Sequence, residues 1–320
     1  MIAVLAGNPS VDRLHSVEVL RPGQIHRPSS VVMLPGGKGI NVARAIVALG
    51  GDAHVLGILG GHSGSWIAEA AAREGIRGTF AWSSSETRTS ISVAQSARPG
   101  EPLTEFYEPA PPVAAEVWSE LEARVAEVVA GASLLCVCGG LIAGAPLAAY
   151  NRAVDLAHAA GRAVAIDSHG DAFAAALKAG PELVKVNALE AAEALGLESP
   201  ERDDDALAWA TAAAAALRDL AGGRGACIVT CGADGMALVD EAGARYQGFL
   251  PEAGPYSVGS GDAAFAAIAL AREGGEPWPA ALRAAIGAGA ANACVPGPGL
   301  LDPRESRELA ARATIRRLAT

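Results

Sequence analysis

The chain has 320 residues, 51% of them hydrophobic, and a formal net charge of −10. This length and apolar content suffice for one large α/β domain, and the acidic balance argues against a nucleic-acid-binding surface. No uninterrupted apolar run reaches the roughly 18 residues that a membrane span needs. The five cysteines lack metal-type spacing, so we expect a reduced, cytoplasmic protein.

The first strand is predicted at Ile2–Ala6, because this apolar stretch lacks the basic flank of a signal peptide. The following loop carries Asp12 at the carboxyl end of that strand, where parallel α/β sheets bind ligands. Weaker alternation predicts strands at Leu14–Leu20 and Ser30–Leu34. A glycine-rich stretch, Pro35–Arg44, then opens a helix, but it is no Walker A loop because Gly39 follows Lys38.

Alternation of apolar and polar residues predicts that Thr79–Tyr107 is antiparallel β structure, unlike the α/β segments around it. From Ser133 onward, strands alternate with helices, which predicts a parallel sheet covered by helices on both faces. The predicted strands of this half are Ser133–Cys138, Ala163–Asp167, Leu183–Val186, Ala226–Cys231, Met236–Val239 and Arg245–Phe249. The last two predicted helices are Pro279–Cys294 and Arg304–Ala319.

The most informative stretch is Gly254–Phe265, where two glycines flank Ser260 and Asp262 follows at once. A glycine turn at a helix N-terminus presents unpaired backbone N–H groups, which suit a phosphate. Asp262 beside that phosphate would act as a general base on an attacking hydroxyl. The alternative is an ordinary glycine turn with an acidic residue in the first helical turn.

Two other stretches carry polar residues at helix starts. Lys38 and Asn41 lie three residues apart within a run of glycines. Asn187 and Glu190 are also three apart and could reach one Mg²⁺ through water, or could form an N-cap with its capping-box partner. The stretch Thr230–Gly235 places two glycines after a strand, which suits the close approach of a nucleotide.

Together these stretches resemble the PfkB (ribokinase-like) carbohydrate kinase family over essentially the whole chain. The resemblance rests on Pro-Gly-Gly-Lys-Gly-Ile-Asn-Val-Ala-Arg at 35–44 and Val-Gly-Ser-Gly-Asp at 258–262. Asn8-Pro9, Asp12-Arg13 and Glu86-Thr87-Arg88 resemble the branch that contains 1-phosphofructokinase and tagatose-6-phosphate kinase. The resemblance implies one three-layer α/β/α Rossmann-like domain over residues 1–320, with a β-sheet lid from about 12–35 and 86–110. It also implies a homodimer that pairs through this lid.

The same resemblance implies ATP-dependent phosphoryl transfer to a sugar hydroxyl, with Asp262 as the base. The backbone of Gly259, Ser260 and Gly261 would form the anion hole. The residues implied at the sugar are Asp12, Gly36, Gly37, Lys38 and Asn41, with Arg88 and Arg27 on a phosphate that the sugar already carries. The residues implied at ATP are Lys185, Asn187, Thr230, Gly232, Gly235 and Asn292, with Asn187 and Glu190 orienting Mg²⁺.

Three positions depart from the family pattern. Gly140 stands where the phosphosugar branch has a serine, His169 replaces a smaller residue, and Tyr256 lies near a monovalent-cation site, which weakens any case for K⁺. Fructose 1-phosphate is our first hypothesis for the acceptor, followed by tagatose 6-phosphate and fructose 6-phosphate. One alternative is a kinase of an unphosphorylated sugar or nucleoside, for which Arg88 and Arg27 would be surface arginines. Another is a catalytically silent sugar- or nucleotide-binding protein.

Overall fold

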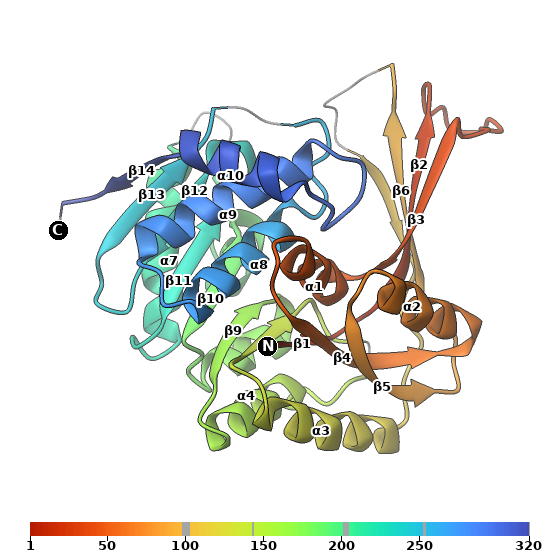
Figure 1. The fold of residues 1–320 in the computed structure, drawn as a ribbon, viewed down its shortest axis with the longest axis horizontal. Helices are drawn as coiled ribbons and strands as arrows, with labels where there is room; N and C mark the ends of the chain where they lie inside the picture. The colour runs from red at the N-terminus through yellow and green to blue at the C-terminus, as the bar shows by residue number, and fades with distance from the viewer. Residues whose placement is uncertain (98–102, 143, 201–204, 252–253, 320) are drawn as a thin grey trace.

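The computed structural model describes residues 1–97, 103–142, 144–200, 205–251 and 254–319. Most strands of this part of the chain belong to one large sheet (Figure 1). They are β1 (Ile2–Ala6), β4 (Ala53–Gly60), β5 (Arg77–Ser83), β8 (Leu134–Cys138), β9 (Ala163–Asp167), β10 (Leu183–Asn187), β11 (Ala226–Thr230), β12 (Met236–Val239), β13 (Arg245–Phe249) and β14 (Thr314–Arg317). Their order across the sheet is β14-β13-β12-β11-β10-β9-β8-β1-β4-β5. Pairing is parallel from β5 to β11 and antiparallel from β11 to β14.

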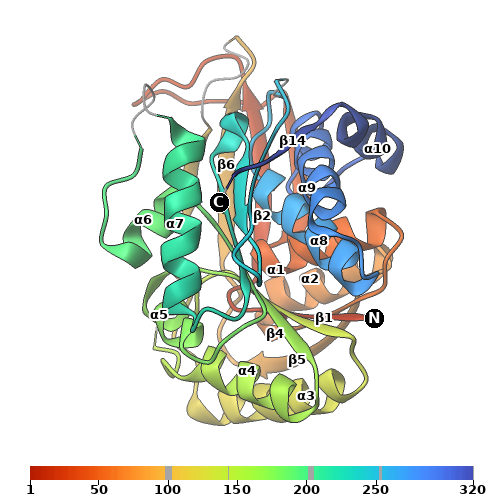
Figure 2. The same cartoon turned by 90° about the vertical axis from the view of Figure 1, so that its left-hand side faces the viewer.

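Helices cover both faces of this sheet, as Figure 2 shows edge-on. One face carries α1 (Lys38–Ala48), α2 (Gly61–Arg73), α8 (Ser260–Glu273), α9 (Trp278–Ala293) and α10 (Pro303–Arg312). The other carries α3 (Ala115–Ala130), α4 (Ala149–Ala159), α5 (Gly170–Leu177), α6 (Ala188–Leu195) and α7 (Ala206–Leu220). The expected three-layer α/β/α core is therefore confirmed. No helix among the described residues is long and apolar enough to cross a membrane.

The strand β1 illustrates how the sequence builds two cores. All five of its residues are buried. Because strand side chains alternate between faces, Ile2 and Val4 pack into the core under α1 and α8. Ala3 and Leu5 pack into the second core, under α3 and α4. A continuous apolar run is thus the signature of a central parallel strand that is covered on both sides.

A second, smaller sheet stands at one end of the large one (Figure 1). It consists of β2 (Ser10–Val17), β3 (Ser30–Gly36), β6 (Thr89–Gln95) and β7 (Thr104–Tyr107), in the order β3-β2-β6-β7. The antiparallel pairing expected within Thr79–Tyr107 is confirmed for β6 and β7, whereas β2, which precedes that region, lies parallel to β6. The chain passes through α1, β4, α2 and β5 between these two strands, a crossover long enough for parallel pairing. Residues 98–102 of the expected lid lie outside the described residues.

Three other elements differ from the sequence prediction. β5 is not antiparallel but pairs parallel with β4 at the edge of the large sheet. The helix α3 was not predicted. The last predicted helix, Arg304–Ala319, is too long, because α10 ends at Arg312 and β14 follows it. The β-branched residues Thr314 and Ile315 favour a strand, and the open edge of β13 supplies its hydrogen-bond partners.

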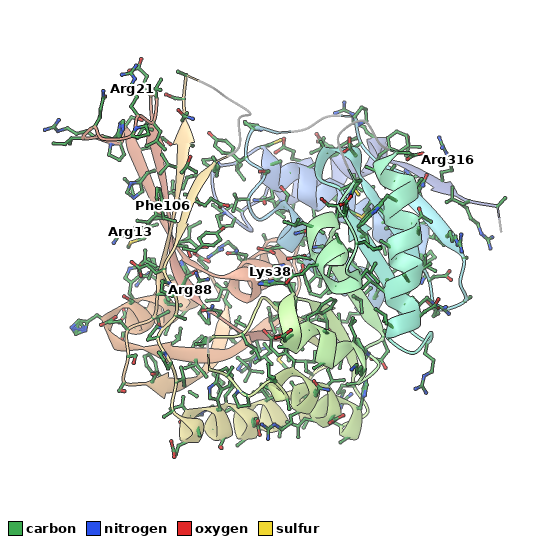
Figure 3. All side chains as sticks on the ribbon, turned by 180° about the vertical axis from the view of Figure 1, so that it is seen from behind. Arg13, Arg21, Lys38, Arg88, Phe106 and Arg316 are labelled. Carbon is green, nitrogen blue, oxygen red and sulfur yellow. The ribbon has the colours of Figure 1, made fainter. Side chains whose placement is uncertain are left out.

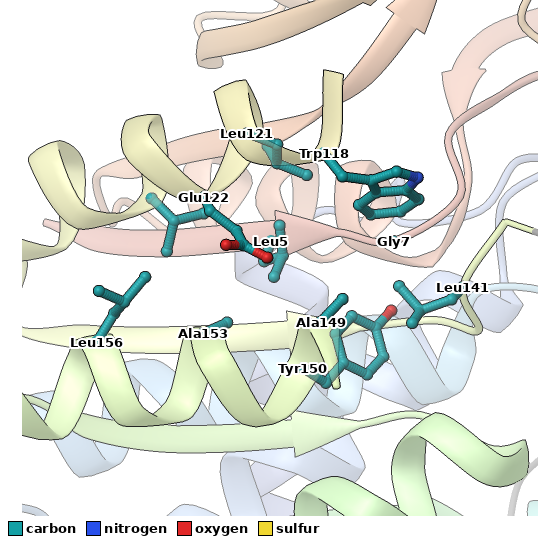
Figure 4. A pocket seen from close by; sticks show the side chains of 11 residues that line it. Leu5, Gly7, Trp118, Leu121, Glu122, Leu141, Ala149, Tyr150, Ala153 and Leu156 are labelled. Atoms are coloured by element: carbon teal, nitrogen blue, oxygen red, sulfur yellow. The ribbon is translucent and has the colours of Figure 1, made fainter. Parts of the chain in front are cut away.

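A small apolar cavity lies between α3 and α4 over the end of β1 (Figure 4). Its volume is about 20 Å³, which leaves room for about one water molecule. Beside it the hydroxyl of Tyr150 donates a hydrogen bond to the carbonyl oxygen of Gly139 at 2.5 Å. This cavity is too small for a metabolite.

Candidate active site

A cleft of about 1190 Å³ opens between the small sheet and the carboxyl ends of the parallel strands. Parallel α/β sheets place ligands at this edge because the loops there converge from several strands. Most of the predicted site residues line it, although they come from widely separated parts of the chain. These residues are Asp12, Gly37, Lys38, Asn41, Arg88, Lys185, Asn187, Glu190, Thr230, Gly232, Gly235, Gly259, Ser260, Gly261 and Asp262.

Three predicted site residues do not line this cleft. Gly36 lies behind Asp12, where a Cβ would come within 2.0 Å of the aspartate carboxyl carbon. Arg27 is exposed in the connection between β2 and β3. Asn292 is fully buried, and its amide donates to the carbonyl oxygens of Gly297 and Leu300, each at 2.8 Å. Its side chain therefore holds the turn after α9 and does not reach a nucleotide directly.

Asp262 lies in the first turn of α8. The helix follows Gly259, whose φ of 84° places it in the left-handed region that favours glycine. The carboxyl group is 8% exposed, and its Oδ2 accepts a hydrogen bond from Asn41 Nδ2 at 2.9 Å. Burial raises the pKa of Asp262 to about 6, against the opposing charges of Lys38 and Lys185. A carboxylate with a pKa near neutrality suits general-base catalysis.

The amide of Asn41 is held in turn by the buried side chain of Arg44. Arg44 Nη1 donates to Asn41 Oδ1 at 3.1 Å and to the carbonyl oxygen of Pro298 at 2.9 Å. Arg44 Nε donates to Glu74 Oε2 at 2.7 Å, and Nη2 donates to the carbonyl oxygen of Pro35. Because Asn41 Oδ1 is occupied, its NH₂ group faces Asp262. Sequence reasoning assigned no role to Arg44, although an arginine on the apolar face of a helix was a usable signal.

Two lysines meet on one buried carboxylate, that of Asp167 at the end of β9. Lys38 Nζ lies 2.8 Å from Asp167 Oδ1, and Lys185 Nζ lies 2.7 Å from Asp167 Oδ2. Asp167 has no exposed surface. Burial raises its pKa, but the two ammonium groups outweigh burial and hold it below its usual value. Sequence reasoning gave Asp167 no role, and an acidic residue at the end of a parallel strand was the signal that could have found it.

Lys38, which was expected at the sugar, forms ion pairs with two carboxylates. Its ammonium also donates to Glu190 Oε1 at 2.9 Å, beside the pair with Asp167. Burial lowers the pKa of Lys38, but the carboxylates of Asp167 and Glu190 more than compensate and raise it well above its usual value. Lys38 is the first residue of α1 and is labelled in Figure 3. The ammonium therefore stays charged, and Lys38 lines the cleft.

The first turn of α8 has the free donors that an anion hole needs. The backbone N–H of Ser260 donates to the carbonyl oxygen of Ser257 at 3.2 Å, so it is already engaged. The N–H groups of Gly261 and Asp262 come next in the helix and have no intrahelical acceptor. The buried Oγ of Ser260 also lacks a partner within the described residues. Lys185 Nζ lies beside this turn, 3.0 Å from where a Cβ on Gly261 would stand.

Asn187 and Glu190 form a capping box at the start of α6. Asn187 Oδ1 accepts from the Glu190 N–H at 2.8 Å, and Glu190 Oε2 accepts from the Asn187 N–H at 2.9 Å. The alternative that this pair forms an N-cap with its capping-box partner is thus confirmed, and both residues also line the cleft. Because Asn187 Oδ1 and Glu190 Oε2 are engaged in the box and Glu190 Oε1 is paired with Lys38, the two residues would hold Mg²⁺ through its waters. Within the described residues no cluster of three or more His, Cys, Asp or Glu side chains could hold a metal alone.

The opposite end of the cleft lies under the small sheet, around Asp12 and Arg88. Asp12 Oδ1 accepts from Ser10 Oγ at 2.6 Å. Arg88 Nε donates to Asn8 Oδ1 at 2.9 Å, and its Nη1 donates to Ser90 Oγ at 2.9 Å. Burial lowers the pKa of Arg88, while Asp12 opposes this shift. Figure 3 shows Arg88 at the base of the small sheet.

The stretch after β11 forms a tight turn, η1 (Gly232–Asp234), before β12. Gly235 has a φ of 111°, and a Cβ there would lie 2.2 Å from the carbonyl oxygen of Gly248. Its glycine is therefore required by backbone packing. Gly232 borders open space, so it leaves room for a ligand. Gly140, His169 and Tyr256, the three departures from the family pattern, also line the cleft.

Comparisons with known proteins agree with this geometry. Residues 6–304 match the model of the pfkB family carbohydrate kinases. The tetrameric inhibited form of phosphofructokinase-2 from Escherichia coli is similar in structure, with a TM-score of 0.85 and 27% identity over 97% of this chain and 98% of that one. A possible 1-phosphofructokinase from Thermotoga maritima has a TM-score of 0.85 and 19% identity over 99% of both chains. A ribokinase-like protein from Agrobacterium tumefaciens has a TM-score of 0.78 and 18% identity over 97% of both chains.

The last two likenesses establish the fold alone, whereas the family model covers nearly the whole chain. The cleft brings together a buried carboxylate, free backbone N–H groups and two lysines, which are the kinds of group that phosphoryl transfer uses. The chain therefore belongs to the pfkB family of carbohydrate kinases, with the ribokinase-like fold, and is an ATP-dependent sugar kinase.

Proposed function

We propose that the chain phosphorylates a ketohexose that already carries a phosphate, with fructose 1-phosphate as the first candidate. The observation that carries this proposal is that a buried carboxylate, Asp262, and an arginine, Arg88, line the same cleft. A guanidinium suits the recognition of a phosphate that the sugar brings with it. The E. coli phosphofructokinase-2 structures include a complex with fructose-6-phosphate at 27% identity, which supports a phosphorylated acceptor. Fructose 6-phosphate and tagatose 6-phosphate are the next candidates.

In the reaction, Asp262 takes the proton of the acceptor hydroxyl as the oxygen attacks the γ-phosphorus of ATP. A new oxygen–phosphorus bond forms, the bond to the bridging oxygen breaks, and ADP leaves with that electron pair. The N–H groups of Gly261 and Asp262 would stabilise the charge on the transferring phosphoryl oxygens. Lys38 and Lys185 hold positive charge beside this turn. Mg²⁺, when bound near Asn187 and Glu190, supplies further neutralisation of phosphate charge.

We also propose that the small sheet serves as a lid and pairs between subunits in a homodimer. Its strands expose apolar side chains, with Val31 at 53%, Met33 at 40% and Phe106 at 58%. An exposed apolar patch of this kind is typical of an interaction surface. Size-exclusion chromatography with light scattering tests this proposal. A monomer at working concentration would contradict it.

A coupled ADP-release assay with Mg·ATP tests the proposed reaction. The acceptors are fructose 1-phosphate, fructose 6-phosphate, tagatose 6-phosphate, fructose, ribose and adenosine, and Asp262→Asn is the blank. We expect turnover of phosphorylated ketohexoses, abolished in the variant. Turnover of unphosphorylated acceptors alone would refute the acceptor class and keep the base. No turnover at all would favour a silent binding protein.

The role of Arg88 has a separate test. Arg88→Ala should raise KM for the phosphorylated acceptor roughly 10- to 100-fold, the scale of one hydrogen bond to a charged group. Arg73→Ala is the matched control, because Arg73 is 63% exposed and pairs only loosely with Glu69 at 3.7 Å. An unchanged KM for every phosphosugar in Arg88→Ala would show that Arg88 does not bind the phosphate.

A further inference from the structure

The side chain of His169 occupies the space that a side chain at position 140 would need. The residue before position 140, Gly139, needs glycine because its φ is 81°. Gly140 has no such requirement, since its φ is not in the left-handed region. A Cβ at position 140 would instead stand 2.8 Å from His169 Nε2 and 3.0 Å from His169 Cε1. The missing side chain at 140 therefore makes room for the imidazole of His169.

His169 has no structural duty that would explain this arrangement. It follows β9 and is the N-cap residue of α5, yet its side chain makes no capping hydrogen bond. The side chain is 48% exposed, so it is not part of a core. Its Nδ1 lies 3.8 Å from Glu190 Oε1, and its Nε2 has no hydrogen-bond partner within the described part of the chain. The ring lines the cleft, with Nε2 beside Gly140.

The surroundings of Gly140 connect this pair to the acceptor end of the cleft, while Nδ1 of the same ring faces Glu190. The carbonyl oxygen of Gly140 lies 2.9 Å from where a Cβ on Gly7 would stand. The next residue, Asn8, accepts from Arg88 Nε at 2.9 Å. Gly139 packs beside Lys38, whose Cβ lies 3.4 Å from the Cβ position of the glycine. Gly140 thus adjoins the loop of Gly7 and Asn8, and Arg88 reaches that loop from the segment before β6.

We propose that His169 is a specificity-determining residue that contacts the acceptor through Nε2, and that Gly140 is glycine to permit it. This inference rests on the proposed function, because it assumes a sugar phosphate in the cleft. An imidazole nitrogen can donate to a phosphate oxygen or exchange a hydrogen bond with a sugar hydroxyl. A serine at position 140 would place its Cβ 2.8 Å from His169 Nε2, so serine at 140 and this position of the ring exclude each other. The two positions therefore act as one unit.

The test is a double-mutant cycle with the variants Gly140→Ala, His169→Ala and both together. KM and kcat are measured for fructose 1-phosphate, fructose 6-phosphate and Mg·ATP. His169→Ala should raise the acceptor KM about tenfold, the scale of one hydrogen bond, with the KM for ATP unchanged. Gly140→Ala should have a similar effect because its methyl group displaces the ring. The double variant should be no worse than His169→Ala, since the two changes disrupt the same contact.

Two controls separate substrate contact from a structural effect. His169→Gln keeps a hydrogen-bonding group and should restore most of the affinity for the acceptor. His62→Ala removes an exposed histidine outside the cleft and should leave every constant unchanged. Turnover by the wild type with an unchanged acceptor KM in His169→Ala would overturn this inference alone. A rise confined to the KM for ATP would overturn it as well. No turnover by the wild type would overturn the proposed function and this inference together.

Discussion

The hydrogen bond from Asn41 to Asp262 should set the pH at which the enzyme becomes active. In the variant Asn41→Ala the buried carboxylate loses a donor at 2.9 Å, and this donor favours the ionised form. A hydrogen bond to a charged group is worth about 1.5–3 kcal/mol, and one pKa unit is about 1.4 kcal/mol. The pKa of Asp262 should therefore rise by roughly one to two units above its value of about 6.

The measurement is kcat/KM for the acceptor as a function of pH at saturating Mg·ATP. The base must be deprotonated, so activity rises with pH through its pKa. We expect the rising part of the pH–activity profile to have its midpoint near pH 6 in the wild type and near pH 7–8 in the variant. A phosphosugar itself ionises with a pKa of about 6, but it does so equally with both enzymes, so the difference between them reports Asp262.

Asn151→Ala is the matched control, because the Asn151 amide donates to the carbonyl oxygen of Ala175 at 3.1 Å, away from the cleft. Thermal unfolding of both variants checks that each is folded. An Asn41→Ala limb that coincides with the wild-type limb would refute the reasoning that Asn41 tunes the base.

Three further variants test the buried charges. Asp167→Asn should lower the free energy of unfolding by about 3–5 kcal/mol in denaturant titration, because it leaves buried Lys185 without a carboxylate partner and Lys38 with Glu190 alone. Because folding lowers the pKa of Asp167, this loss of stability should be complete above about pH 4 and should shrink as the pH falls. The control is Asp171→Asn, since Asp171 is exposed. An equal loss of stability at pH 7 and pH 3 would contradict the prediction. The raised pKa of Asp262 has the opposite sign, so Asp262→Asn should be more stable than the wild type at pH 8, by roughly 1–3 kcal/mol, and no more stable near pH 4. Arg44→Lys should lower kcat about tenfold and shift the base limb upward, because one ammonium cannot replace three guanidinium nitrogens that bond to Asn41, Glu74 and Pro35. Arg73→Lys should change neither value.

The large sheet could be predicted from the sequence because its signal is local. A stretch such as Ile2–Ala6 is apolar throughout, so it indicates a strand covered on both faces. The parallel pairing of β2 with β6 could not be predicted in this way, since register between strands far apart in the chain depends on tertiary packing. β14 was missed for a related reason, because four residues with two arginines carry little strand signal until β13 offers an edge.

The site was predictable where glycines mark it. Gly259 is required by its positive φ and by the backbone of Pro298, Gly261 leaves room for the ammonium of Lys185, and both lie in the stretch that the sequence singles out. The roles of Asp167 and Arg44 depend on contacts between residues up to 254 positions apart, which no local pattern encodes. Asn292 shows the reverse case, where a polar residue in the right region holds the backbone and not the ligand.

The short strand β14 closes one side of the large sheet, and its composition bears on solubility. An open sheet edge can pair with another chain and start aggregation. β14 places Arg316 and Arg317 at this edge, where like charges on two copies would repel each other (Figure 3). Arg317 also lies over the ring of Tyr246 on β13, 6.0 Å from its centroid, which helps to hold the strand in place. The last residues of the chain thus shield β13 from edge-to-edge association, so a C-terminal truncation before Thr314 would uncover a strand prone to self-association.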